Sequence, residues 1–305
     1  MKHLLKAGNR QFDLATPICM GVINVTPDSF SDGGNLAKSD AGPFVVDIDK
    51  VLRKVESYLD QGASVVDVGG ESTRPGSHGV PLDEELERTI PVIEAVRKNL
   101  DVCLSIDTSS PTVMAEAISA GAELINDVRA LSSPGAIEVA ANSGAAVCLM
   151  HMSGQPINMQ ESLHYDDVVK DVSDYLRERA KTCIKAGDFE HRLLVDPGFG
   201  FGKSVIHNYK LLKHLSVITE LGFPVLVGLS RKSMIGEVVN RSTKERVSGS
   251  VAASIIALNN GASVIRSHDV AATMDAIGVH CAYSCLLYTS PSPRDQRGSR
   301  MPSSA

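Results

Sequence analysis

Eight polar residues stand at intervals along the first part of this 305-residue chain, each at the end of a short apolar run. Their side chains are carboxylates, amides, an imidazole, a hydroxyl and a guanidinium, which can bind polar heterocycles, anions and hard cations. They are Asn24, Asp67, Asp107, Asn126, His151, Asp196, Ser230 and Arg266. Such chemistry requires the residues to meet in space, so the elements that precede them must bring them together.

The apolar runs predict buried parallel strands, because each is short and rich in Val, Ile and Leu. The runs are Ile18–Ile23, Val65–Val66, Val102–Ile106, Leu124–Ile125, Ala145–Met150, Leu193–Val195, Val225–Leu229 and Ser263–Ile265. Amphipathic segments typical of helices, such as Phe44–Leu59 and His207–Leu221, separate them. Eight such units predict one α/β domain, a (β/α)8 TIM barrel, in which catalytic groups lie at the carboxyl ends of the strands.

Three strand-end residues match the edge of a flat nitrogen heterocycle. Asp107, Asn126 and Asp196 supply two carboxylates and one amide, a set suited to a 2-amino-4-oxo-pteridine. Each could instead cap a helix, and Asp107 before Thr-Ser-Ser-Pro is a fair N-cap candidate. Capping alone is a poor explanation for three residues that converge.

Two strand-end loops are rich in groups that bind phosphate. The run Asp67–Gly76 contains a glycine pair that lets a ligand approach the backbone, followed by the donors Thr73 and Arg74. His268 follows Arg266 after the last strand, where barrels often bind phosphate. Arg74 could instead form a surface salt bridge and His268 could be an ordinary loop histidine, but the pattern favours an anion site.

The first strand leads into a polar loop that begins at Asn24. Its amide oxygen suits Mg²⁺, which prefers oxygen ligands and usually keeps waters or substrate phosphate oxygens. The alternative is that Asn24 and Asp28 only cap turns.

The loops after the sixth and seventh strands offer a further set of groups. The glycine-rich run Asp196–Ser204 is not a phosphate-binding P-loop, because proline occupies the position of its first glycine. It presents Phe199 and Phe201, one of which could pack on an aromatic substrate. The helix start at Ser230–Ser233 suits a carboxylate or phosphate. Lys232 within it could instead form a Schiff base, but the sixth strand lacks the lysine of barrel aldolases.

Composition excludes some classes of partner. The net charge is −6, no Lys/Arg face is clustered and Trp is absent, which argues against nucleic-acid binding. No signal peptide or membrane-length apolar run is present, so we expect a cytoplasmic protein without a membrane partner.

Three segments divide the chain. Residues 1–16 form an N-terminal segment and residues 17–283 form the barrel. Residues 284–305 are rich in Ser, Pro and Arg, lack apolar periodicity and resemble translated sequencing-adaptor read-through, so we expect a non-native, disordered tail after a shortened last helix.

Four motifs together resemble those of bacterial dihydropteroate synthases, in colinear order over about residues 12–280. They are Met20–Gly34, Asp67–Gly76, Asp196–Lys203 and Arg266–Asp269. The resemblance implies a transferase of folate biosynthesis that condenses p-aminobenzoate with 6-hydroxymethyl-7,8-dihydropterin diphosphate, releases pyrophosphate and uses Mg²⁺. It also implies a homodimer.

The resemblance also implies roles for single residues. The pterin would be held by Asp107, Asn126, Asp196 and Lys232, with Asp67 deeper; Asp107, Asp196 and Lys232 would be catalytic. Pyrophosphate would be bound by Ser29, Thr73, Arg74, Arg266 and His268, and the metal by Asn24. The aminobenzoate would contact Phe30, Pro75, Phe201, Ser230 and Ser233. His151 receives no role beyond a structural one or a place at the edge of the pocket.

Two alternative functions share the pterin site. A pterin-dependent methyltransferase domain has the same barrel but needs no anion-binding set, and a non-catalytic pterin-binding protein would be expected to have lost at least one group of that set. The presence of Ser29, Arg74, Arg266 and His268 favours the synthase.

Overall fold

The computed structural model describes residues 4–27, 36, 44–71, 79–154 and 164–288, with side chains described as far as residue 285. Eight parallel strands form its main sheet. They are β3 (Ile18–Asn24), β4 (Val65–Gly69), β5 (Cys103–Asp107), β6 (Leu124–Asp127), β7 (Ala146–Met150), β8 (Leu193–Asp196), β9 (Leu226–Gly228) and β10 (Val264–Ser267). The order β8-β7-β6-β5-β4-β3-β10-β9 is that of a barrel, and a bridge between Val195 and Val225 joins its two outer strands. The predicted (β/α)8 fold is confirmed.

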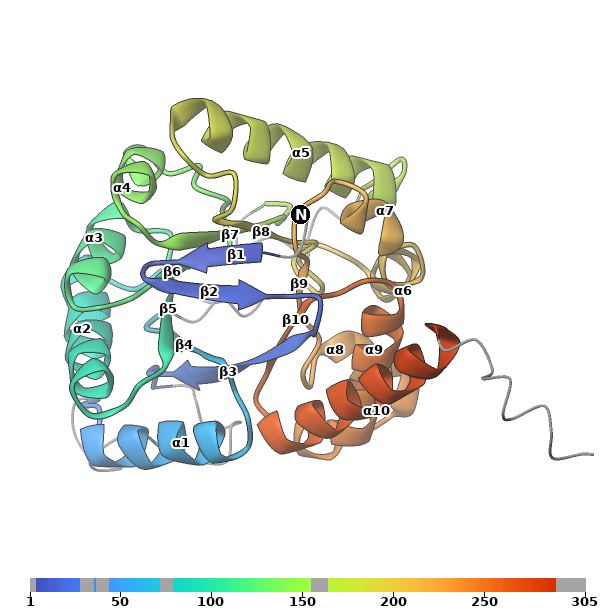
Figure 1. Cartoon of the computed structure of the whole chain (residues 1–305), viewed down its shortest axis with the longest axis horizontal. Coiled ribbons are helices and arrows are strands. Elements are labelled where there is room, and N and C mark those ends of the chain that lie inside the picture. The colour runs from blue at the N-terminus through green and yellow to red at the C-terminus, as the bar shows by residue number, and fades with distance from the viewer. Residues whose placement is uncertain (1–3, 28–35, 37–43, 72–78, 155–163, 289–305) are drawn as a thin grey trace, which may run out of the picture.

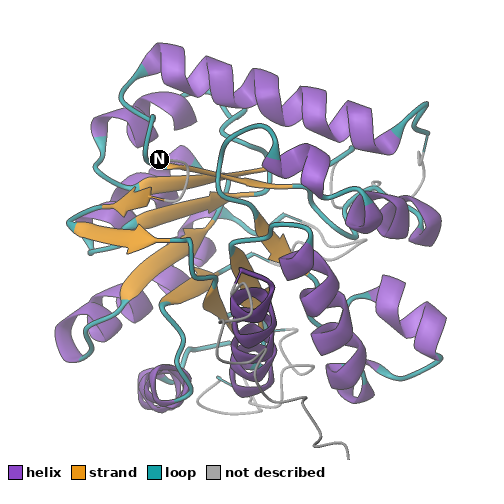
Figure 2. Cartoon of the chain, turned by 45° about the vertical axis from the view of Figure 1, so that its right-hand side comes forward, coloured by secondary structure: helices purple, strands orange, loops and turns teal. Residues whose placement is uncertain are grey.

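Helices surround the strands, as Figures 1 and 2 show from two sides. They are α1 (Ile48–Asp60), α2 (Leu82–Asn99), α3 (Pro111–Ser119), α4 (Ala136–Asn142), α5 (Val168–Ala186), α6 (Val205–Lys213), α7 (Ser216–Thr219), α8 (Ser233–Val239), α9 (Val247–Asn259) and α10 (Val270–Tyr288), with a 3-10 turn η2 at Thr243–Glu245. In α1, Val51, Val55 and Tyr58 are buried. Their spacing of three to four residues places them on one helix face, which packs on the sheet.

An antiparallel hairpin crosses the barrel in the view of Figure 1. It consists of β1 (Leu4–Ala7) and β2 (Arg10–Asp13). Leu5 and Ala7 belong to a buried cluster with residues near the amino ends of the barrel strands, among them Val65. The hairpin therefore closes the end of the barrel opposite the strand ends that carry the polar residues. The sequence prediction left residues 1–16 without an element, although a Gly-Asn pair between short strand-like runs is a hairpin signal.

Some boundaries differ from the sequence prediction. Helix α1 begins at Ile48 rather than Phe44, because the carboxylate of Asp47 caps it by accepting from the backbone N–H of Lys50 at 3.1 Å. The expected helix His207–Leu221 is divided into α6 and α7.

The last helix runs further than expected. Helix α10 continues to Tyr288, beyond residue 283, where the sequence analysis ended the barrel. The segment up to Tyr288 contains no proline and its last glycine is Gly278, so nothing in the local sequence stops the helix before the prolines that follow. The rest of the expected tail, residues 289–305, lies outside the described residues. Among the helices that are described, none is both long enough and apolar enough to cross a membrane.

Candidate active site

One guanidinium links two of the predicted site carboxylates. Arg266, on β10, donates from Nε to Oδ2 of Asp67 and from Nη2 to Oδ2 of Asp107, both at 2.7 Å. Asn126, on β6, donates from Nδ2 to the same oxygen of Asp67 at 3.0 Å. The structure thus brings together four residues that the sequence placed at strand ends. Arg266, expected to bind pyrophosphate, is paired here with the carboxylates of the predicted pterin set.

The alternation of side chains along β4 explains the buried carboxylate in this strand. Val66 and Val68 pack in the main core, so Asp67 between them points to the interior of the barrel. Asp67 is 0 % exposed, and its Oδ1 has no hydrogen-bond partner within the described parts of the chain. An unpaired buried acceptor is costly unless a ligand donates to it. The site therefore suits a ligand that carries N–H groups.

Burial shifts the protonation of this cluster. It raises the pKa of Asp107 to about 7, and the positive charge of Arg266 opposes that shift. Burial also raises the pKa of Asp196 at the end of β8, where Lys232 opposes the shift. Desolvation thus disfavours the charged form of both carboxyl groups, and the neighbouring cations Arg266 and Lys232 favour it.

Lys232 lies on the β8 side of the site, against the glycine-rich loop. Its Nζ donates to the carbonyl oxygen of Phe199 and lies 4.7 Å from the centroid of the Phe201 ring. Burial lowers the pKa of Lys232 to about 8, while the charge of Asp196 raises it. Asp196 itself accepts at Oδ1 from the backbone N–H of Gly198 at 2.7 Å.

Gly228 joins the two halves of the site. A Cβ atom at Gly228 would lie 3.9 Å from Nζ of Lys232 and 4.0 Å from Cβ of Arg266. Lys232 and Arg266 therefore border the same space. Arg266 opposes the rise in the pKa of Asp107, and Lys232 opposes the rise in the pKa of Asp196.

Ser230 and His268 form a second polar pair at the strand ends. Nδ1 of His268 lies 3.1 Å from Oγ of Ser230, which also accepts from the backbone N–H of His268 at 3.3 Å. Ser233 is exposed at the start of α8. The hydroxyl of Ser230 is thus close to the imidazole predicted to bind pyrophosphate, whereas Ser233 has no hydrogen bond to either residue in the described part of the chain.

Asn24 ends β3 beside the cluster. A Cβ atom at Gly69 would lie 3.7 Å both from Oδ1 of Asn24 and from Oδ2 of Asp107, so both side chains border the space in front of Gly69. Across the described residues, no group of three or more His, Cys, Asp or Glu side chains could hold a metal. A single amide oxygen fits Mg²⁺ only if the remaining ligands are waters or substrate oxygens, which is the usual arrangement for that ion.

Five predicted site residues lie outside the described residues. They are Ser29, Phe30, Thr73, Arg74 and Pro75.

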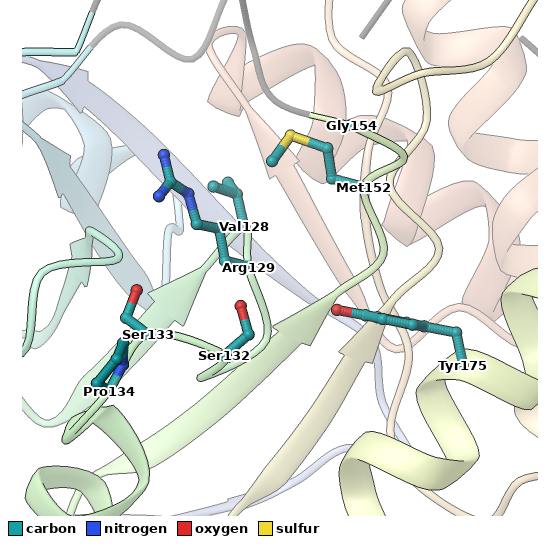
Figure 3. A pocket seen from close by; sticks show the side chains of 8 residues that line it. All are labelled: Val128, Arg129, Ser132, Ser133, Pro134, Met152, Gly154 and Tyr175. Atoms are coloured by element: carbon teal, nitrogen blue, oxygen red, sulfur yellow. The ribbon is translucent and has the colours of Figure 1, made fainter. Parts of the chain in front are cut away.

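A cavity of about 340 Å³ is lined by residues that follow β6 and β7 and by Tyr175 of α5 (Figure 3). Its lining includes Arg129, Ser132, Met152 and Tyr175, none of which was a predicted site residue. The Nε atom of Arg129 is buried and has no hydrogen-bond partner among the residues that the structure describes.

Sequence reasoning missed one buried lysine next to the site, Lys203, whose pKa is lowered to about 7 by burial, a shift that the charge of Asp196 opposes. Lys203, at the end of the glycine-rich loop, is 3 % exposed and lies within hydrogen-bond distance of His151, the strand-end residue left without a role. A charged residue inside an otherwise glycine- and phenylalanine-rich run was the available signal.

Comparison with known proteins finds relatives of this chain. A family model described as pterin binding enzyme matches residues 20–268. The dihydropteroate synthase of Haemophilus influenzae is 48% identical over 275 residues, which make up 90% of this chain and 97% of that protein.

Solved structures of dihydropteroate synthases share the fold. The Xanthomonas albilineans enzyme with 4-aminobenzoic acid superposes with a TM-score of 0.84 at 45% identity, covering 95% of this chain and 100% of the other. The Burkholderia cenocepacia enzyme complexed with 7,8-dihydropteroate superposes with a TM-score of 0.81 at 42% identity, covering 93% and 97%.

Proposed function

The chain belongs to the pterin binding enzyme family, and within it to the dihydropteroate synthases, and from this premise we propose how its residues carry out the reaction. Dihydropteroate synthase joins p-aminobenzoate to 6-hydroxymethyl-7,8-dihydropterin diphosphate. It releases pyrophosphate and forms 7,8-dihydropteroate for folate synthesis. The chain is a transferase whose substrates are small molecules.

The pterin is bound in the barrel mouth by residues that match its hydrogen-bonding edge. The observation that carries this assignment is the convergence of Asp67, Asp107 and Asn126 around Arg266, with Oδ1 of Asp67 left without a partner in the described chain. Carboxylates accept from the amino and ring N–H groups of the pterin, while Asn126 can donate and accept. Asp196 and Lys232 contact it from the β8 side.

Catalysis is electrostatic. The aryl amine is a weak nucleophile, so the barrier falls most if positive charge at the pterin methylene and negative charge on departing pyrophosphate are both stabilised. Asp107 and Asp196 stabilise the first, and no side chain acts as a nucleophile. Lys232 keeps the pterin in place against the loop that contains Phe199.

Pyrophosphate is bound by cations at the same face. Arg266 uses Nε and Nη2 on carboxylates, and its Nη1 makes no hydrogen bond to a described residue. We assign that N–H₂ group and the imidazole of His268 to the leaving group as donors. The pyrophosphate-binding set is completed by Ser29, Thr73 and Arg74, which we assign because their motifs resemble those of dihydropteroate synthases.

Asn24 would hold Mg²⁺ through its amide oxygen, with the remaining ligands supplied by substrate oxygens and waters. A bound ion would supply positive charge that offsets the charge of the leaving pyrophosphate.

The aminobenzoate contacts the ring of Phe201, with its carboxylate near the α8 start at Ser233 and the neighbouring Ser230. The same resemblance assigns Phe30 and Pro75 to the surface that contacts the aminobenzoate.

The protein acts in the cytoplasm as a homodimer, without nucleic-acid or membrane partners. Helices α9 and α10 expose the large apolar side chains Ile256, Val279 and Tyr283, at 45%, 65% and 55%. Exposed apolar groups on adjacent helices are typical of an interface. Sedimentation of the wild-type protein and of Val279→Glu tests this, with a shift to monomer expected for the variant.

The reaction is tested by measuring pyrophosphate release. We expect release to require the dihydropterin diphosphate, p-aminobenzoate and Mg²⁺ together. Release without p-aminobenzoate would indicate a hydrolase, and pterin binding without any release would indicate a non-catalytic pterin-binding protein. Methyl transfer from a methylated pterin to a corrinoid protein would support the methyltransferase alternative.

A further inference from the structure

Two buried polar residues behind the glycine-rich loop have no part in the proposed reaction. They are Lys203, 3 % exposed, and His151, 7 % exposed. Nζ of Lys203 lies 3.0 Å from Nδ1 of His151 and 3.3 Å from its carbonyl oxygen. The same Nζ donates to the carbonyl oxygens of Gly198 and Phe201 at 2.9 and 3.1 Å. Four acceptors therefore surround this Nζ, enough to engage all three N–H groups of an ammonium.

The loop that Lys203 holds is packed backbone against backbone. Gly198, Gly200 and Gly202 have φ angles of 68°, 82° and 61°, which favour glycine. A Cβ atom at Gly198 would lie 1.9 Å from the carbonyl oxygen of His151, and one at Gly202 would lie 2.5 Å from that of Ser153. So tight a turn directs its carbonyl oxygens into a buried space, where Lys203 supplies the donor.

The other side of this loop contacts the pterin-binding residues. The carbonyl oxygen of Phe199 accepts from Nζ of Lys232, and the ring of Phe201 lies beside the same ammonium. The backbone N–H of Gly198 donates to Asp196. The turn from Gly198 to Phe201 therefore lies between two lysines, one behind it and one in the site.

His151 is held as a neutral acceptor for Lys203. Its ring packs edge-on against Tyr175, with centroids 5.0 Å apart. Burial lowers the pKa of His151 to about 3, and the charge of Lys203 acts in the same direction. Nδ1 then accepts from the ammonium. Tyr165 adds a second anchor, because its hydroxyl donates to the carbonyl oxygen of Gly202 at 2.9 Å.

We propose that Lys203, with His151 as its acceptor, is a positioning residue for pterin binding: it fixes the Gly198–Phe201 turn so that Phe199 and Phe201 hold Lys232 against the pterin. This inference rests on the proposed function of the site. It gives His151 the role that the sequence left open.

The test combines Lys203→Met with a surface control. Methionine keeps the apolar stem and removes the ammonium, so the four buried acceptors around Nζ lose this donor and the turn relaxes. We expect the Kd for 6-hydroxymethylpterin, measured by fluorescence, and the KM for the pterin diphosphate to rise about tenfold or more, with a smaller change in kcat. Lys210→Met removes a lysine that pairs with Asp167 on the surface and should leave both values within about twofold.

A second pair of variants decides the matter if Lys203→Met does not fold. His151→Asn keeps an acceptor where Nδ1 stands, whereas His151→Leu removes it. We expect the asparagine variant to retain pterin affinity and the leucine variant to lose it. Equal Kd values for the two, or a folded Lys203→Met with unchanged Kd and KM, would overturn the proposal. A wild-type protein that binds pterin but releases no pyrophosphate would refute the proposed function instead, and the binding comparison would still test the positioning role.

Discussion

The carboxylate of Asp107 and the guanidinium of Arg266 are 159 residues apart in sequence and form a 2.7 Å hydrogen bond in the barrel mouth. The same guanidinium holds Asp67, so one cation offsets the charge of two buried carboxylates. Removing one partner from a buried ion pair costs more than the pair contributes, because the remaining charge stays desolvated.

Arg266→Met should therefore destabilise the protein strongly. We expect the free energy of unfolding to fall by about 3–5 kcal/mol, as for other broken buried pairs, measured by urea denaturation at neutral pH. Arg241→Met is the control, because its 3.8 Å pair with Glu245 is more than half exposed on both sides. That variant should lose less than about 1 kcal/mol. Similar losses in both variants would contradict the role of Arg266.

Asp107→Asn should fold and lose activity. An amide replaces the carboxylate at similar size but cannot stabilise positive charge on the pterin. We expect kcat to fall by about 10²-fold or more, the scale of one lost electrostatic contact. Circular dichroism checks the fold of the variant, and turnover near the wild-type value in a folded protein would remove Asp107 from the mechanism.

The pH dependence of pterin capture should be bell-shaped. Asp107, with a pKa raised to about 7, must lose its proton to accept from the pterin, so kcat/KM for the pterin diphosphate rises with pH through that value. Lys232, with a pKa lowered to about 8, must keep its proton, so kcat/KM falls above that value. Arginine stays charged, so Lys232→Arg should retain the acid limb and lose the alkaline one. A variant profile that keeps both limbs would assign the alkaline limb to another group.

Two adjacent glycines should respond differently to a methyl group. At Gly69 the added Cβ meets Asp107 at 3.5 Å and Asn24 at 3.7 Å, which is ordinary contact inside the site. Gly69→Ala should keep its melting temperature and raise KM for the pterin diphosphate. At Gly70 the Cβ would lie 2.6 Å from Cγ2 of Thr89, so Gly70→Ala should melt at a lower temperature. A reversed pattern would show that the space in front of Gly69 does not receive substrate.

Asn24→Ala should weaken the apparent affinity of the protein for Mg²⁺. Without the amide oxygen, a higher Mg²⁺ concentration is needed for half-maximal pyrophosphate release. Asn99→Ala, which removes an exposed amide from α2, serves as the control. An unchanged Mg²⁺ dependence in Asn24→Ala would exclude this residue as a ligand.

The barrel and much of its site could be predicted because the pattern is repetitive. Each apolar run ends at a polar residue, and parallel strands in a closed barrel bring such ends together, so Asp107 and Asn126 were identifiable without distances. The pairing of Arg266 with Asp67 was not, because it crosses β3 between their strands and depends on side-chain reach. The contact between Lys203 and His151 likewise joins two loops that no local pattern connects.

The hairpin at the amino end of the barrel ties the first residues of the chain to much later ones. The backbone N–H of Lys6 donates to the carbonyl oxygen of His191, and that of Gly8 to the carbonyl oxygen of Gly144. During synthesis Gly144 is translated before the midpoint of the chain, whereas His191 is reached only at nearly two thirds of it, so the hairpin cannot complete both bonds until then. The order of translation therefore makes full closure a late event, because a nascent chain that stops before His191 lacks Leu194, Leu226 and Val264 of the buried cluster to which Leu5 belongs.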